Sequence, residues 1–295
     1  MSFEVPPQTP LYHAIHKSRY ARQDLIKTIQ DLTGRTLLVY FADLTSPNGL
    51  IGPLDIGPFG DLLHRVPAGS PIDLFLQSPG GDVDKAEKIV YMCRSKASSF
   101  RVIVPESAKS AATMIALASD EIVMGYTSEL GPIDPQVVTV VDGRPVQRPA
   151  KSFLDGLELI KKEAEANDGQ LSPVYFPLLT HLDPSLIDYC FKAVERSKAF
   201  AKKWLLRGMC KGKEELANKI AEELTNVEKY LSHGSVIDWE EAKNIGLNIT
   251  YLPPDDPLWE LIWRLYCTYL VDMQAVGEQA KASKIFESEH VSIVI

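Results

Sequence analysis

The 295-residue sequence has few cysteines and histidines, no long uninterrupted apolar run and no surplus of basic residues. Its four cysteines lie far apart and form no Cys-x-x-Cys pair, which excludes a disulfide framework and a finger-type zinc site. The most apolar long stretch, residues 258–273, contains three charged side chains and is too short to span a bilayer. The chain begins with neither the basic nor the apolar part of a signal peptide. These absences predict a protein of a reducing compartment, which we expect to be cytoplasmic and without a membrane span.

The charge balance also bears on which ligands the protein can bind. The 31 Lys and Arg residues against 39 Asp and Glu residues give a net charge of −8, so binding to nucleic acid is not expected. Neither a GxGxxG nor a GxxxxGK[ST] motif occurs, and no cluster has the spacing of metal ligands. We therefore expect no cofactor and no metal. A hydrophobic fraction of 45% in a chain of this length predicts a globular protein with a full core.

The middle of the chain contains a regular alternation of strand and helix patterns. Short apolar runs at 72–76, 101–104 and 121–125 are separated by helical patterns that begin near Asp82 and Ser110. Short links between such elements predict parallel strands joined by right-handed crossovers. Elsewhere we predict a helix over 12–32, a strand over 36–42, an Asp-Gly hairpin within 137–147, helices over 152–167, 183–209, 213–225, 238–246 and from 256, and a weakly structured tail from 275 to the last six residues.

Two turns of this alternation are candidates for chemistry. In a parallel sheet the loops after successive strands gather at one edge, so residues 78–81 and residues 106–110 are expected to face each other. Glycine lets backbone N–H groups approach a substrate closely, and a serine at a helix start lies beside unpaired N–H groups. Either turn alone is ordinary. Together they offer the hydroxyl of Ser110 as a nucleophile and the amides of Gly81 and Ala111 as donors to an oxyanion.

At these residues the sequence resembles a known family. The segments SPGGDVDKAEKIV (78–90), AKSAATMIALASDEIVM (108–124) and LGPIDPQ (130–136) are similar to the Clp-protease/crotonase superfamily, and within it most to the serine dehydrogenase proteinase family. Signal peptide peptidase A and the NfeD-type peptidases are more distant relatives. The resemblance covers residues 22–252 and implies an α/β spiral of β-β-α units, here with a C-terminal helical extension.

The resemblance also implies self-association and hydrolysis of peptide bonds through an acyl-serine intermediate. Carried over to this sequence, Ser110 matches the nucleophile, Gly80 and Gly81 match the glycine pair of the substrate and oxyanion site, and Ala111 matches the second amide. We divide the chain into an N-terminal helical segment (1–35), a catalytic domain (36–252) and a C-terminal helix with its tail (253–295).

The base that would activate the serine has two candidates. Clp proteases have a histidine near the position of the LGPIDPQ segment, and this chain has none there. The resemblance to the serine dehydrogenase proteinases continues at residues 230–247 and implies His233, a residue type that titrates near neutral pH. The same family implies an acid before the serine, for which Asp82 is the candidate and Asp73 and Asp84 are rivals.

The second candidate base is Lys151, in a Ser-Lys dyad like that of signal peptide peptidase A and the NfeD-type peptidases. A lysine can act as a base only where burial lowers its pKa, and Lys151 lies beside a predicted helix start, where lysines are usually solvated. Lys109 adjoins Ser110, so its side chain is expected to point elsewhere along the turn.

We therefore expect a serine peptidase that acts on a peptide or an unfolded protein and forms a homo-oligomer. The aromatic stripe of the predicted C-terminal helix fits either core packing or a subunit interface (Trp259, Trp263, Tyr266 and Tyr269). Two alternatives remain. A crotonase-type enzyme would use the same fold and oxyanion donors on an acyl-CoA thioester. A catalytically inactive scaffold or peptide-binding protein would explain the missing histidine.

Overall fold

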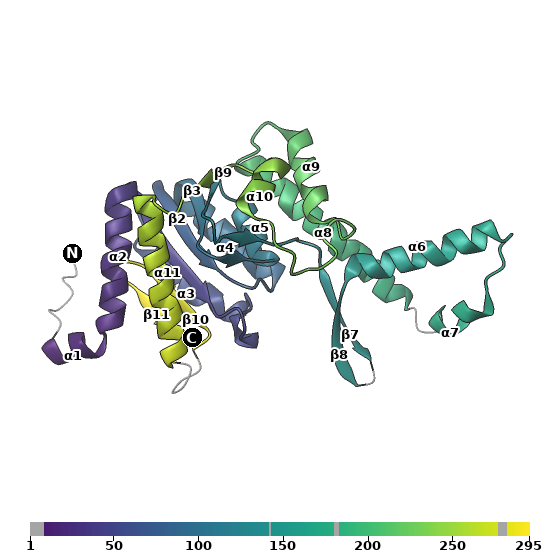
Figure 1. The fold of residues 1–295 in the computed structure, drawn as a ribbon, viewed down its shortest axis with the longest axis horizontal. Helices are drawn as coiled ribbons and strands as arrows, with labels where there is room; N and C mark the ends of the chain where they lie inside the picture. Colours follow the sequence, from purple (N-terminus) through teal and green to yellow (C-terminus); the bar gives the residue numbers. More distant parts are fainter. Residues whose placement is uncertain (1–8, 142, 180–182, 277–281) are drawn as a thin grey trace.

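The computed structural model describes residues 9–141, 143–179, 183–276 and 282–295. Over these ranges the chain forms a body built on a central sheet and an arm that projects from it (Figure 1). The elements are, in chain order, α1 (Pro10–Ile15), α2 (Lys17–Thr33), β1 (Thr36–Ala42), η1 (Pro47–Gly49), η2 (Pro53–Asp55), α3 (Ile56–His64), β2 (Ser70–Gln77), α4 (Val83–Lys96), β3 (Ala97–Val104), β4 (Ser107–Ala108), α5 (Ala111–Leu117), β5 (Glu121–Met124), β6 (Glu129–Leu130), β7 (Gln136–Val141), β8 (Arg144–Pro149), α6 (Ala150–Ala166), η3 (Pro173–Tyr175), α7 (Phe176–Leu179), α8 (Pro184–Arg207), α9 (Glu214–Leu224), α10 (Trp239–Ile245), β9 (Ile249–Tyr251), α11 (Pro257–Val276), β10 (Lys284–Glu287) and β11 (Ser292–Val294).

The central sheet has the strand order β11-β10-β1-β2-β3-β5-β9 over the described part of the chain. The strands β1, β2, β3, β5 and β9 are parallel, which confirms the predicted crossovers. Successive residues of a strand point to opposite faces, and β1 is apolar on both: Leu38 and Tyr40 pack on one side, Leu37 and Val39 on the other. The sheet is therefore covered on both faces.

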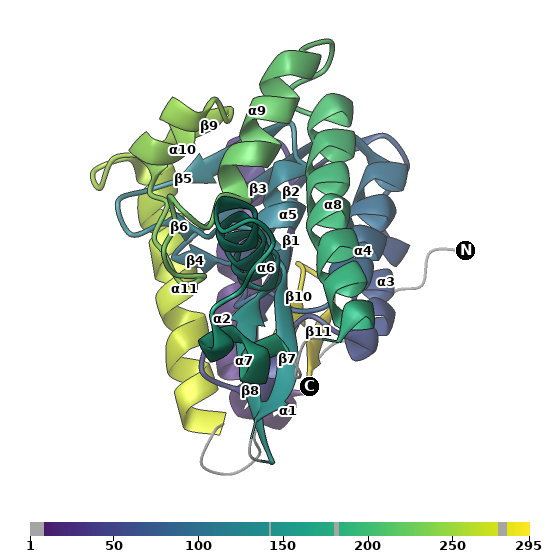
Figure 2. The same ribbon diagram turned by 90° about the vertical axis from the view of Figure 1, so that its right-hand side faces the viewer.

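One face of the sheet packs against α3, α4 and α5, while α2 and α11 lie together on the other face (Figures 1 and 2). The aromatic stripe of α11 points into this second layer. Trp259 and Tyr269 are 1% and 0% exposed, and Tyr266 is 7% exposed. These three rings are core residues, so packing within the chain explains them, while Trp263 is half-buried at the edge of the same cluster.

The tail contains more regular structure than the sequence indicates. Residues 277–281 lie outside the described part of the chain, but β10 and β11 follow and extend the sheet beyond β1 as antiparallel strands. The prediction of a weakly structured tail is therefore wrong for β10. This strand begins with Lys284 and ends with Glu287, and both are buried because each pairs with an opposite charge distant in sequence. The division at 35 and 252 stays a prediction.

The arm consists of the β7–β8 hairpin, α6, α7 and the first part of α8, which runs on into the body (Figure 1). The predicted hairpin is confirmed, although Asp142 of its turn lies outside the described residues. A small apolar cluster of Val137, Ala150, Cys190 and Val194 holds the base of the arm. No helix among the described residues is both long enough and apolar enough to cross a bilayer.

Candidate active site

The two predicted turns meet at the carboxyl edge of the sheet. The segment after β2 and the segment after β3 pair in parallel at Ser78 and Ala108, with Ser78 N donating to Ser107 O at 3.0 Å and Lys109 N donating to Ser78 O at 3.0 Å. This pairing confirms that the glycine turn and the serine turn face each other.

The glycine pair needs glycine at both positions. Gly80 and Gly81 have φ angles of +96° and +142°, which side chains disfavour. A Cβ at Gly80 would lie 2.8 Å from Ser110 Cβ, and one at Gly81 would lie 2.5 Å from Ile51 N. The absence of side chains therefore lets this segment contact the serine turn on one side and Ile51 on the other.

Ser110 has the strained backbone expected of a positioned nucleophile. Its φ and ψ are 52° and −117°, and it is half-buried immediately before α5. Non-glycine residues rarely adopt a positive φ, which costs about 1–3 kcal/mol and persists only where the surroundings enforce it. Among the described residues, the amide N–H groups of Gly81 and Ala111 and the hydroxyl of Ser110 have no hydrogen-bond partner. A hydroxyl and two backbone donors without partners thus lie on neighbouring segments.

His233 lies in the same cavity as Ser110, which has a volume of about 590 Å³. His233 Nδ1 and Asp134 Oδ1 are 2.7 Å apart, and the carboxylate is buried. The other oxygen of Asp134 accepts a hydrogen bond from Gln136 Nε2 at 2.6 Å. If Nδ1 carries the proton, as a carboxylate partner favours, Nε2 keeps a lone pair that can accept a proton.

Lys109 fixes the histidine segment beside the serine turn. Its Nζ donates to Leu130 O and Ser235 O, both at 3.1 Å, and pairs with Glu129 at 2.9 Å. Leu130 and Ile237 also exchange two backbone hydrogen bonds of 2.9 and 3.1 Å. Although residues 110 and 233 are distant in sequence, these contacts hold their two loops together, and Lys109 points away from Ser110 as expected.

The carboxylate that contacts the histidine is not the one expected from the sequence. Asp82 Oδ1 caps α4 by accepting from Asp84 N at 2.8 Å and Lys85 N at 3.2 Å, and Asp84 pairs with Arg196. Asp82 lines the cavity, but the hydrogen bonds of its carboxylate are to the α4 amides rather than to the histidine.

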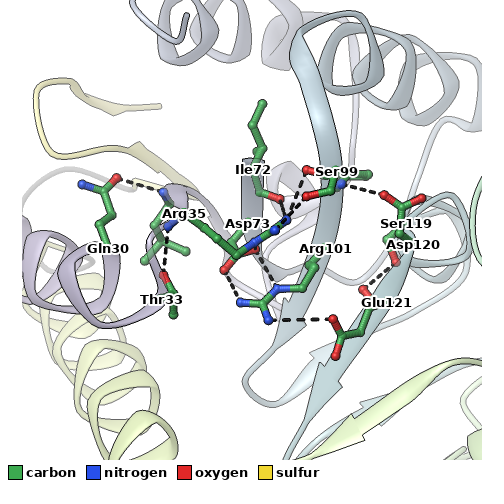
Figure 3. Close-up of polar contacts among 12 residues, drawn as sticks. Gln30, Thr33, Arg35, Ile72, Asp73, Ser99, Arg101, Ser119, Asp120 and Glu121 are labelled. Carbon is green, nitrogen blue, oxygen red and sulfur yellow. Dashed lines mark hydrogen bonds and ion pairs between the residues drawn. The ribbon is translucent and has the colours of Figure 1, made fainter. Parts of the chain in front are cut away.

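Asp73 lies within β2, four residues before its last residue Gln77, and Figure 3 shows it between Arg35 and Arg101. Its two oxygens accept from Arg101 at 2.9 and 2.7 Å, and it also pairs with Arg35. Lys151 pairs with Asp155 one turn along α6, and both side chains are more than one-third exposed. Lys151 is not among the residues that line the cavity with Ser110 and His233.

Asp134 is not among the acids that the sequence predicts, although it lies in the LGPIDPQ segment, near which Clp proteases have a histidine. A carboxylate in a loop that follows the serine helix is the signal that points to it. Among the described residues, no group of three or more metal-ligating side chains is present.

Ser110, Gly81 and His233 line one cavity, and a strained serine, a free amide and a histidine paired with an aspartate are parts that serine hydrolases use. A family model described as ClpP-like SDH-type serine proteinase matches residues 61–277, and the chain belongs to this family. This confirms the expected ClpP-like α/β fold and the expected relation to the serine dehydrogenase-type proteinases.

Two uncharacterized proteins of Methanocaldococcus jannaschii are similar to this chain. MJ0137 is 33% identical over 196 residues, covering 66% of this chain and 58% of the relative. MJ1495 is 29% identical over 187 residues, covering 63% and 54%. The chain thus spans a little over half the length of these relatives.

Two solved structures of the 1510-N membrane-bound stomatin-specific protease are also similar. A serine-to-alanine mutant has a TM-score of 0.28 at 25% identity, over 39% of this chain and 58% of that chain. A lysine-to-alanine mutant in complex with a substrate peptide has a TM-score of 0.34 at 18% identity, over 75% and 94%.

Proposed function

We propose that this chain hydrolyses peptide bonds through an acyl-serine, with Ser110 as nucleophile, His233 as base and Asp134 as the acid that orients it. The observation that supports this most is the His233–Asp134 hydrogen bond of 2.7 Å at the cavity that Ser110 lines. It favours a peptidase over an inactive scaffold or an acyl-CoA enzyme, neither of which needs such a pair.

The proposed reaction proceeds in two halves. Ser110 Oγ attacks the carbonyl carbon while its proton passes to His233 Nε2, and the resulting oxyanion accepts hydrogen bonds from the N–H groups of Gly81 and Ala111. His233 then protonates the departing amine as the C–N bond breaks. Water hydrolyses the acyl-serine by the same route in reverse, which restores the hydroxyl.

The cavity walls suit an extended peptide. Pro79 and Gly81 lie on one side, and Gln136, Val138 and Gln147 of the β7–β8 hairpin on the other. The hairpin side consists of strands, and an extended backbone can pair with a peptide main chain whatever its side chains. We therefore propose unfolded protein segments or peptides as substrates.

The test uses a fluorophosphonate probe, which forms a covalent bond only with an activated serine. We expect the wild-type protein to be labelled on the peptide that contains Ser110 and the Ser110→Ala variant to remain unlabelled, with casein hydrolysis lost in parallel. Equal labelling of the two proteins would remove Ser110 from this role.

Self-association is proposed through the arm. Several of its apolar side chains are more than half exposed, which is unusual on a surface that stays in water (Val138, Val140, Leu159, Val174, Phe176 and Phe191). Light scattering should show an oligomer that is weakened by Val140→Glu. The cytoplasmic location stays a prediction.

A further inference from the structure

The Gly81 N–H is aimed by the peptide group to which it belongs. In a trans peptide the C=O and N–H bonds point in opposite directions, so whatever holds the Gly80 carbonyl also directs the Gly81 amide. Gly80 O accepts from Ile51 N at 2.7 Å, on the side away from the serine. Two adjacent glycines rotate with little steric resistance, so hydrogen bonds such as this one supply the constraint that side chains do not.

The backbone of Ile51 is positioned in turn by the buried side chains of Lys284 and Asp55. The peptide that supplies Ile51 N–H has Leu50 O as its carbonyl, and Leu50 O accepts from Lys284 Nζ at 2.7 Å. On the other side, Ile51 O accepts from Asp82 N at 2.9 Å, and Gly52 N of the same peptide donates to Asp55 Oδ2 at 2.7 Å. The peptide groups before and after Ile51 therefore each make two hydrogen bonds, one to the backbone of residues 80–82 and one to a charged side chain.

The two charges form one buried unit. Lys284 Nζ and Asp55 Oδ1 are 2.6 Å apart, and the residues are 4% and 0% exposed. Tyr40 OH donates to Asp55 Oδ2 at 2.9 Å, and burial followed by the charge of Asp55 raises the pKa of Tyr40, so the phenol stays a donor. Water cannot replace any of these bonds at such burial, and hydrogen bonds in a chain polarise one another.

We propose that Lys284 and Asp55 are positioning residues for the oxyanion site, acting through Ile51 on the Gly81 amide. This inference rests on the proposed function of that amide. The residues that transmit the effect, Tyr40, Ile51, Asp55 and Lys284, all lie outside residues 61–277, so the family match assigns them no role. The C-terminal strand β10 thereby completes the site at the opposite end of the sequence.

The test compares Lys284→Met with Glu287→Gln. Both remove one member of a buried ion pair on β10, but Glu287 pairs with Arg22 on the α2 side of the sheet and does not touch Ile51. A peptide boronate mimics the tetrahedral intermediate, whereas the cleaved product peptide does not. For Lys284→Met we expect kcat and boronate affinity to fall about 10- to 100-fold, with KM and product affinity within about twofold, because small misplacements of catalytic groups have effects of this size.

The Glu287→Gln variant should lose thermal stability but keep the boronate affinity of the wild type. Equal boronate affinities in the two variants would overturn the inference. If wild-type protein fails to react with the fluorophosphonate probe at Ser110, the proposed function itself fails, which is a separate result. Should Lys284→Met not fold, Tyr40→Phe replaces it: a loss of boronate affinity of about threefold supports the inference, and no loss overturns it.

Discussion

Two buried aspartates, Asp73 within the sheet and Asp134 in a loop beside the cavity, have different hydrogen-bond partners. Asp73 is surrounded by Arg35 and Arg101 (Figure 3). Its hydrogen bond raises the pKa of the Arg101 guanidinium, which stays charged at any physiological pH. Asp134 binds His233, which can gain and lose a proton. The partner, more than the burial, separates a structural carboxylate from one suited to catalysis.

The same contrast extends to the backbone. Near the amino ends of the strands, Phe100 N donates to Asp120 at 2.8 Å and Arg94 pairs with the same carboxylate at 2.8 Å. At the carboxyl edge, the amides of Gly81 and Ala111 have no partner among the described residues, and Ser110 is strained. Unsatisfied groups and strain cost stability, so their meeting at Ser110, Gly81 and Ala111 indicates where the chain is shaped for chemistry.

The largest expected effect separates the two candidate bases. His233→Ala should lower kcat/KM for an unfolded peptide by about 10³- to 10⁴-fold, because the serine loses its proton acceptor. Lys151→Ala should leave it within about twofold, since its amine belongs to an exposed pair on α6 of the kind that contributes about 0.3–0.5 kcal/mol. Steady-state measurement of kcat/KM for the two variants decides which residue is the base. The opposite ranking would make Lys151 the base.

The next prediction tests the two aspartates with the same substitution. Asp134→Asn should lower kcat about 10³-fold while the unfolding temperature stays near that of the wild type, because the amide no longer orients the imidazole. Asp73→Asn should lower the free energy of unfolding by about 3 kcal/mol and leave kcat of the folded protein unchanged, because two guanidinium groups lose their counter-charge.

Urea denaturation and kinetics on both variants provide the measurement. A loss of kcat in Asp73→Asn at full folding, or a large loss of stability without loss of kcat in Asp134→Asn, would contradict the distinction between the two aspartates.

The sequence predicts the glycine turn (78–81), the serine turn (106–110) and their proximity, because the residues that indicate each turn are neighbours in the sequence. Proline and glycine end a strand, a helix pattern follows, and parallel topology brings the two loops together. His233 follows from the resemblance of residues 230–247 to the serine dehydrogenase proteinase family. The parallel sheet itself follows from short apolar runs separated by helical patterns.

Asp134 and β10 could not be predicted in the same way because their partners are distant. Asp134 binds a histidine 99 residues further on, and no local pattern marks an aspartate in a loop as one that will be buried. Lys284 and Glu287 look like solvated charges until Asp55 and Arg22 are brought to them by the fold. The strand β10 is therefore not predicted from the sequence, because charged residues stand at positions where a local pattern of apolar residues would indicate a buried strand.

The smallest predicted effect concerns the strain at Ser110. Ser110→Gly and Ser110→Ala should both be inactive and differ only by a methyl group. Glycine adopts a φ of 52° with a ψ of −117° freely, whereas alanine retains the strain, so the glycine variant should be more stable by about 1 kcal/mol in urea denaturation. In unstrained positions glycine is the less stable of the two by a similar amount, because it loses more chain entropy on folding. The sign of the difference therefore reports whether the serine turn is held in a strained conformation, and a more stable alanine variant would show that it is not.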